Sequence, residues 1–359
     1  MQPIMARQRI NCSMIQLAVL ASLTLFCSCS TKTNNPVEAI NTTNSSTWTQ
    51  VNVGLTNHFV RSLAVSKGNL FAGTDGGLFL STNDGASWTI ANTGLEGNIV
   101  NVLAIVDTSI IAGTNNGVFR SSNNGESWGA ANDGFINTNT NVISFAATLT
   151  SLFAGTELGG VFRSAKNSIA WTEVSSGLTT LSSNHINTLA IVGTNIFAGT
   201  YGSGIFLSTD NGTSWRAAGT GLTGGGYVVH ALLGLGVDLF AGTNNGLYCS
   251  TTNGANWTQL DTGWAISTKI DSGLTYTNYY TNVTSMLASG TDLIAGTVEG
   301  GIFLSTDNGA KWTAADSGLK FTNSNDVLSM ITSGTNLFVA TAGNGVWRLS
   351  LNGITSAKH

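Results

Sequence analysis

The sequence predicts an all-β protein: a single seven-bladed β-propeller of four-stranded antiparallel blades, closed by the N-terminal strand pairing into the last blade. Two repeated landmarks predict this fold. Tryptophan recurs at spacings of 40, 40, 43, 44, 42 and 55 residues, and Phe-Ala-Gly-Thr or a variant of it follows the same period. A sustained period of this length is typical of propellers. The tryptophans are Trp48, Trp88, Trp128, Trp171, Trp215, Trp257 and Trp312. The second landmark begins at Phe71, Ile111, Phe153, Phe197, Phe240, Ile294 and Phe338.

Four short strands fit into each unit. In the first unit they are predicted at residues 60–65, 70–74, 78–81 and 87–91, separated by turns rich in Asn, Asp and Gly. These residues tolerate the positive φ angles that tight hairpins require. Four antiparallel strands per unit describe a propeller blade. A parallel β-helix has much shorter coils, and a two-sheet sandwich does not explain seven repeats.

The two ends of the repeat region are predicted to share one blade. Residues 48–51 match the fourth strand of a unit, and residues 345–351 match the third. Pairing of these segments completes the last blade and removes a free strand edge. The predicted propeller therefore spans residues 47–351, and residues 352–359 form a tail.

The composition excludes several functional classes. Only 9% of the 359 residues are charged and 42% are hydrophobic, which argues against disorder. Beyond residue 29, 12 Lys and Arg stand against 18 Asp and Glu with no basic run, so we expect no nucleic-acid partner. The remaining apolar stretches are too short to span a bilayer. Because His58, His185 and His230 lack metal-ligand spacing, we expect no metal and no cofactor.

The first 29 residues have the composition of an export signal. Two arginines precede an apolar stretch and small residues that lead to Cys29. Residues 26–29 resemble the box of a bacterial lipoprotein signal, which implies lipidation of Cys29; ordinary secretion is the alternative. Residues 30–46 have the composition of a tether. Cys249 is then the only cysteine left, so no intrachain disulfide is expected.

A recurring motif precedes most of the tryptophans. Two copies read S-x-D-x-G-x-x-W, and three others carry Asn or Thr at the Asp position. The pattern resembles the Asp-box, or sialidase-type BNR, repeat, and the resemblance covers nearly all of the chain after the signal. It implies a structural role: the third residue accepts hydrogen bonds from the turn, and Trp packs between sheets. The residues concerned are Ser81, Asn83, Gly85, Trp88, Asn123, Gly125, Trp128, Asp210, Gly212, Trp215, Gly254, Trp257, Asp307, Gly309 and Trp312.

The resemblance leaves the activity open, because Asp-box propellers include sialidases, xyloglucan-cleaving glycosidases, sortilin-type receptors and photosystem II assembly factors. A sialidase needs three convergent arginines, whereas Arg120, Arg163 and Arg348 occupy one third-strand position in different blades. A glycosidase needs two carboxylates that flank the scissile bond. The candidates, Glu157 and Glu299, fall on blades three and six, far apart around the ring. We therefore assign no catalytic residue.

Ligands are expected on the face formed by the turns between second and third strands and by the connectors between blades. Side chains there are mostly amides and hydroxyls, which suit sugar or peptide binding. The connector at residues 261–282 is the longest, and its aromatic residues offer large contact area at low entropic cost. The alternative is a loop folded onto its own aromatics. The predicted ligand-binding residues are Trp264, Tyr276, Tyr279, Tyr280, Tyr201, Asn115 and Asn244.

These observations favour an exported, non-catalytic propeller, a monomer held at the bacterial cell envelope by its lipid anchor, that binds a glycan or a protein. Two alternatives stay open. One is a carbohydrate-active hydrolase that uses Glu157 and Glu299. The other is an assembly factor for a membrane complex, which rests on analogy of fold alone.

Overall fold

The computed structural model describes residues 47–135, 140–260, 265–271, 274–279, 282–298, 301–319 and 326–351, with the backbone alone at 265–279. These residues lie almost entirely in β-strands and turns. The exceptions are a one-turn helix, α1 (Leu181–Asn184), and a 3₁₀ turn, η1 (Gly224–Tyr227). Neither these nor any other helix in the described ranges is long and apolar enough to cross a membrane. The predicted signal, tether and tail lie outside the described residues.

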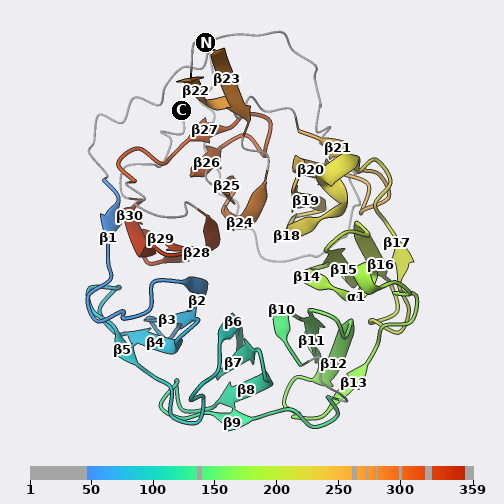
Figure 1. Cartoon of the computed structure of the whole chain (residues 1–359). Helices are drawn as coiled ribbons and strands as arrows, with labels where there is room; N and C mark the ends of the chain where they lie inside the picture. The colour runs from blue at the N-terminus through green and yellow to red at the C-terminus, as the bar shows by residue number, and fades with distance from the viewer. Residues whose placement is uncertain are drawn as a thin grey trace, which may run out of the picture. The chain divides into compact units, whose positions relative to one another are not determined.

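Seven four-stranded antiparallel sheets, the blades, account for most strands, and each runs from its innermost to its outermost strand (Figure 1). Blade 1 is β2 (Val60–Ser66), β3 (Asn69–Thr74), β4 (Gly77–Ser81) and β5 (Thr89–Ile90). Blade 2 is β6 (Val100–Val106), β7 (Ser109–Thr114), β8 (Gly117–Ser121) and β9 (Gly129–Ala130). Blade 3 is β10 (Val142–Ala147), β11 (Ser151–Thr156), β12 (Val161–Ala165) and β13 (Trp171–Glu173). Blade 4 is β14 (Ile186–Val192), β15 (Asn195–Thr200), β16 (Ile205–Ser208) and β17 (Arg216–Ala217).

The remaining blades follow the same order. Blade 5 is β18 (Val229–Leu235), β19 (Asp238–Thr243), β20 (Gly246–Ser250) and β21 (Thr258–Gln259). Blade 6 is β24 (Val283–Ser289), β25 (Asp292–Thr297), β26 (Ile302–Ser305) and β27 (Thr313–Ala314). Blade 7 is β28 (Val327–Ser333), β29 (Asn336–Thr341), β30 (Gly345–Ser350) and β1 (Thr49–Gln50).

The ring closes through the first strand. β1 pairs antiparallel with β30, with Thr49 opposite Arg348 and Gln50 opposite Trp347, which confirms the predicted closure. Each innermost strand contacts the innermost strands of its two neighbours, and β2 contacts both β6 and β28. The chain is a seven-bladed β-propeller.

Indole N–H groups join neighbouring blades. Trp88 Nε1 donates to the carbonyl of Val51 at 2.7 Å, and Trp215 Nε1 donates to the carbonyl of Val174 at 2.7 Å. In each case the acceptor lies three residues after the tryptophan of the preceding blade. Trp48, Trp128, Trp171 and Trp257 bond in the same way, and Trp48 does so across the ring closure. The bond described for Trp312 is to Gly309.

The second strand of each blade forms the centre of the core. The phenylalanines that open the Phe-Ala-Gly-Thr landmark are fully buried: Phe71, Phe153, Phe197, Phe240 and Phe338. Close packing explains why the third residue of the Phe-Ala-Gly-Thr landmark is glycine. A Cβ on Gly73 would lie 2.6 Å from Ser62 Oγ and 2.9 Å from the carbonyl of Val100, the first residue of the next inner strand. Neighbouring blades can therefore approach this closely only at glycine.

A β-bulge interrupts every innermost strand at the same place. The register shifts between the first and third residues in all seven blades, as between Val60 and Ser62 in blade 1. A bulge changes the direction of the side chains beside it. The consecutive residues Arg61 and Ser62 lie at this bulge in blade 1, and both belong to the lining of the central channel.

The connector between blades 5 and 6 differs from the expected loop. It forms a hairpin of β22 (Ala265–Asp271) and β23 (Leu274–Tyr279), a two-stranded sheet outside the seven blades. Its strands have seven and six residues, as in the first hairpin of blade 1, and its register shifts between Ala265 and Ser267. The Thr, Tyr and Ile residues of these strands have high β-propensity, which explains the hairpin.

Candidate functional site

In the turns between third and fourth strands, the polar side chains form hydrogen bonds within the turn itself. Ser208 Oγ donates to Asp210 Oδ1 at 2.8 Å and accepts the N–H of Gly212 at 2.8 Å. Hydrogen bonds from the side chain and backbone N–H of Ser214 lower the pKa of Asp210 to about 2. In blade 1, Asn83 accepts the N–H of Ser87 at 2.9 Å in the same geometry. These side chains stabilise turns and carry no catalytic arrangement.

The third-strand arginines bind the neighbouring blade. Arg163 Nη1 donates to the carbonyl of Asn211 at 2.9 Å, and Arg348 Nη1 donates to the carbonyl of Asp84 at 3.1 Å. Arg120 Nη2 reaches Asn167 Oδ1 at 3.4 Å. Each arginine therefore contacts the third-to-fourth-strand turn of the next blade. The three side chains serve three different blade junctions and do not converge on one substrate carboxylate.

The opposite ends of the blades form a second face, which we call the connector face. In every blade, the first residue of the turn after the second strand donates its N–H to the carbonyl just before the innermost strand. Tyr201 N, for example, donates to His185 O at 3.1 Å. The other donors are Asp75, Asn115, Glu157, Asn244, Val298 and Ala342. These bonds bring the turns and the connectors between blades to the same end of the molecule.

An aromatic platform lies on the connector face at blades 3 to 5, formed by Glu157, His185, Tyr201 and Tyr227. The rings of His185 and Tyr201 stack with centroids 4.9 Å apart and planes inclined by 22°. Tyr201 is 57% exposed and Tyr227 is 45% exposed. Burial lowers the pKa of His185, and the nearby Glu157 carboxylate opposes that shift. The neutral imidazole is therefore favoured in the stack.

Backbone contacts hold the platform together. Gly204 N donates to Tyr227 O at 2.9 Å, and Tyr201 forms an antiparallel bridge with Val228. Asn141 Nδ2 donates to Glu157 Oε2 at 2.6 Å. The stack of Tyr201 on His185 was not predicted. The pairing of β14 with β15 places these two residues together at the end of the first hairpin of blade 4.

Two predicted amides have local partners on this face. Asn115 Oδ1 accepts the N–H of Ile99 at 2.8 Å, and Asn244 Oδ1 lies 2.6 Å from His230 Nε2. Tyr276 and Tyr279 lie in β23. Trp264, Tyr280 and Glu299 lie outside the described residues, so Glu157 is the one member of the candidate carboxylate pair that can be placed. Within the described ranges, no group of three His, Cys, Asp or Glu residues could hold a metal ion.

A cavity of about 240 Å³ occupies the central channel. Its lining comes from the innermost strands of six blades: β2, β6, β10, β14, β18 and β28. Its polar side chains are Arg61, Ser62, Asn101, Asn187, His230 and Ser329, among others. The sequence analysis did not predict that these side chains line one cavity. The available signal was the second residue of the innermost strand, which is polar in five of the seven blades: Arg61, Asn101, Asn187, His230 and Thr284.

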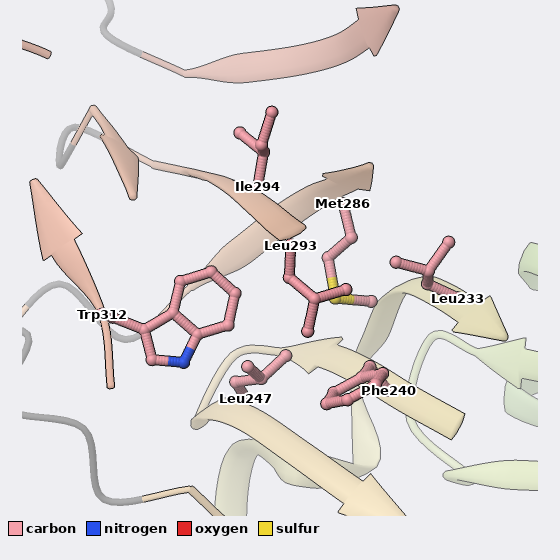
Figure 2. Close-up of a pocket in the computed structure, with 7 residues that line it drawn as sticks. All are labelled: Leu233, Phe240, Leu247, Met286, Leu293, Ile294 and Trp312. Carbon is pink, nitrogen blue, oxygen red and sulfur yellow. The ribbon is translucent and has the colours of Figure 1, made fainter. Parts of the chain in front are cut away.

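A second pocket, between blades 5 and 6, belongs to the core. Figure 2 shows the side chains of blade 5 facing those of blade 6 across it. Its interior is apolar and leaves no room for a water molecule. We therefore do not treat it as a ligand site. The lining residues are Leu233, Phe240, Leu247, Met286, Leu293, Ile294 and Trp312.

Comparison with known proteins supports the fold. The DUF6242 beta propeller domain family matches residues 13–152 of the chain. No match was found among curated proteins. The extracellular domain of a putative hybrid two component system from B. thetaiotaomicron is similar with a TM-score of 0.66 at 18% identity. The match covers 85% of this chain and 40% of that one, so the chain spans well under two thirds of its neighbour.

Two further solved structures are similar over most of the chain. The GH74 xyloglucanase from Xanthomonas campestris has a TM-score of 0.61 at 16% identity, and the match covers 86% of this chain and 54% of the enzyme. YCF48 from Cyanidioschyzon merolae has a TM-score of 0.63 at 13% identity, and the match covers 85% of this chain and 98% of YCF48. At these identities the likeness establishes the propeller fold alone.

Proposed function

We propose that this protein is an exported, non-catalytic propeller that binds a glycan or a protein at the bacterial cell envelope. The observation that carries the proposal is the stack of Tyr201 on His185. It presents an exposed aromatic ring in a fixed orientation on the connector face. Tyrosine supplies a large, rigid contact area and a hydroxyl group at low conformational cost, which is why it is common in binding surfaces.

The chemistry of the platform favours binding over hydrolysis. Of its four side chains only Glu157 is a carboxylate, and that group accepts a hydrogen bond from Asn141. A glycosidase of the usual type requires a second carboxylate on the other side of the scissile bond. The arrangement therefore offers stacking and hydrogen bonding without an acid and base pair.

Export and anchoring are part of the proposal. The similar domain from B. thetaiotaomicron is described as extracellular, which supports an exported protein. We propose that Cys29 is lipidated and holds the propeller at a membrane surface through the tether at residues 30–46. The aromatic residues of the insert, Trp264, Tyr276, Tyr279 and Tyr280, are proposed as a further contact for the ligand.

The test is binding of the purified chain to a broad glycan array, with release of reducing sugar measured for every glycan that binds. We expect saturable binding without release, and weaker binding by Tyr201→Ala. Ile90→Ala is the matched control, because Ile90 is also exposed but lies in the outermost strand of blade 1. If no glycan binds, crosslinking in the native envelope identifies the protein partner. Turnover of a glycan would overturn the non-catalytic proposal in favour of a hydrolase.

A further inference from the structure

We infer that the connector face at blades 3 to 5 contains a docking site for a polypeptide segment that carries bulky apolar side chains together with Lys or Arg. The inference rests on the proposed function and gives the chemistry of a protein ligand for it. It starts from four exposed hydrophobic side chains, which we call the apolar patch: Leu158, Leu181, Tyr201 and Tyr227. Their exposed fractions are 46%, 79%, 57% and 45%.

The four side chains come from adjoining elements. The turn after β11, which carries Leu158, meets α1 where Gly160 N donates to Asn184 O at 3.0 Å. The N-terminal end of α1 meets the turn after β15, where Thr180 Oγ1 lies 3.3 Å from Ser203 Oγ. That turn carries Tyr201 and pairs with the segment that ends η1. The apolar patch is therefore one continuous run from blade 3 to the start of blade 5.

Grouping distinguishes these side chains from the other exposed hydrophobic residues. In the described ranges ten large hydrophobic side chains are exposed, and four of them make up the apolar patch. Exposed hydrophobic residues that are scattered singly are normal, whereas a group of them marks an interaction surface. The side chains of Leu158 and Leu181 have no group that donates or accepts a hydrogen bond, so they gain most from an apolar side chain of a partner. The two leucines therefore favour a protein ligand at this patch.

The charge of the connector face selects a basic partner. Its described turns and connectors contain six carboxylates and neither Lys nor Arg. Glu157 is exposed and directly precedes Leu158 in the patch. Arg61, in β2, pairs with Asp75 and leaves the face with an excess of negative charge. Such a surface attracts a segment with Lys or Arg and disfavours an acidic one. The six carboxylates are Asp75, Glu96, Asp133, Glu157, Asp316 and Asp326.

The experiment selects peptides on the purified chain from a random 12-residue library displayed on phage. We expect the selected peptides to be richer than the starting library in large apolar residues, Lys and Arg, and poorer in Asp and Glu. The best synthetic peptide is then titrated by fluorescence anisotropy. Replacing Leu158 and Leu181 together by Ser should weaken its affinity by about tenfold or more, because both aliphatic contacts are removed. The matched control is Val237→Ser, since Val237 is 76% exposed but lies in the turn between β18 and β19, on the opposite face.

The charge is tested separately with Glu157→Gln. We expect this variant to bind the peptide severalfold more weakly at low salt and to depend less on salt concentration than wild type. The matched control is Glu126→Gln, which changes an exposed carboxylate in the turn after β8. It should keep the affinity and the salt dependence of wild type.

Circular dichroism of each variant separates loss of binding from loss of fold. Three results overturn the docking site: the library yields no enriched peptide, the selected peptides are acidic, or the folded double leucine variant binds like wild type. If glycans of the array bind through Tyr201 while no peptide is selected, the proposed function stands and the docking site is wrong. If no glycan and no peptide binds, and crosslinking in the native envelope finds no partner, the proposed function fails as well.

Discussion

Gly94 lies against the backbone carbonyl of Trp128, so closely that a Cβ on Gly94 would stand 2.2 Å from that oxygen. Gly94 follows Trp88 by six residues and has φ +90°. Its counterparts meet the next tryptophan carbonyl at 2.1–2.2 Å: Gly54, Gly134, Gly177 and Gly221. This glycine therefore recurs at these blade junctions together with the tryptophan. Like the tryptophan, it has a regular spacing in the sequence.

Replacing this glycine is expected to destabilise the propeller strongly. Gly94→Ala should lower the free energy of unfolding by about 3 kcal/mol, because a positive φ and a steric clash act together. Gly97→Ala is the control, since Gly97 has φ +77° but no atom lies within 4 Å of the place that a Cβ would take. It should cost about 1 kcal/mol from φ alone. Equal losses in chemical denaturation would show that the contact with Trp128 contributes nothing.

The turn carboxylate Asp210 should give stability a specific dependence on pH. Its pKa falls from 3.8 to about 2 on folding, so its contribution is present above pH 3.8 and is lost as pH falls through 2. Asp210→Asn should fold, because Asn123 accepts the N–H of Ser127 at the same position of blade 2. Denaturation of this variant should depend less on pH between 4 and 2 than that of wild type. Identical pH profiles would contradict the assignment.

Glu157 tests the hydrolase alternative. If the proposed function is right, Glu157→Gln should leave glycan binding nearly unchanged. Wild type then releases no reducing sugar, so the variant has no hydrolytic activity to lose. A glutamine retains the carbonyl acceptor that Asn141 bonds. Should wild type hydrolyse a bound glycan, loss of turnover in Glu157→Gln and Glu299→Gln would support the carboxylate pair. Turnover that survives both changes would exclude it.

The aromatic residues of the insert provide a separate test. Alanine at Trp264, Tyr279 and Tyr280 together should weaken affinity for the identified ligand, because each ring removes contact area. The seven blades should remain folded, since β22 and β23 form a sheet of their own. Titration of the triple variant beside Tyr201→Ala compares the two surfaces. Unchanged affinity in the triple variant would remove the insert from the site.

Lipidation of Cys29 can be measured directly. Wild type should fractionate with membranes, and intact mass should show a lipid on Cys29 as the new N-terminal residue. Cys29→Ser should move the protein to the soluble fraction without changing the thermal midpoint of the propeller. Unmodified Cys29 in the membrane fraction would contradict the anchor.

Most of the fold was predictable because it is periodic. The same four-stranded unit is indicated seven times, by a tryptophan, a similar second strand and turn residues at fixed offsets. When such blades repeat, closing them into a ring pairs the strand edges at the two ends of the chain. The details that differ are local. The fourth strand of blade 1 is only Thr89–Ile90, and the 261–282 connector contains a hairpin where a loop was expected. The high β-propensity of the Thr and Tyr residues explains why this segment forms a hairpin and not an irregular connector.

The candidate site was predictable only in part. Tyr201 was identified from its turn, and the face that carries it follows from blade topology. The stack with His185, however, was not predicted. It forms where the hairpin of β14 and β15 brings the residue before the innermost strand beside the first residue of the next turn, and that pairing follows from strand register. The polar lining of the central channel, to which Arg61 and Asn101 belong, was not predicted.

The sequence by itself determined the number of blades, the identity of their core residues and the strand that closes the ring, since each depends on a pattern repeated along the chain. Tertiary structure alone decided which of the polar groups on the innermost strands have hydrogen-bond partners. Asn101, Asn187 and Ser285 are used at blade junctions, whereas the buried hydroxyl of Ser62 has no partner among the described residues. The physical reason is that hydrogen-bond satisfaction depends on distances between neighbouring blades, and those distances follow from packing.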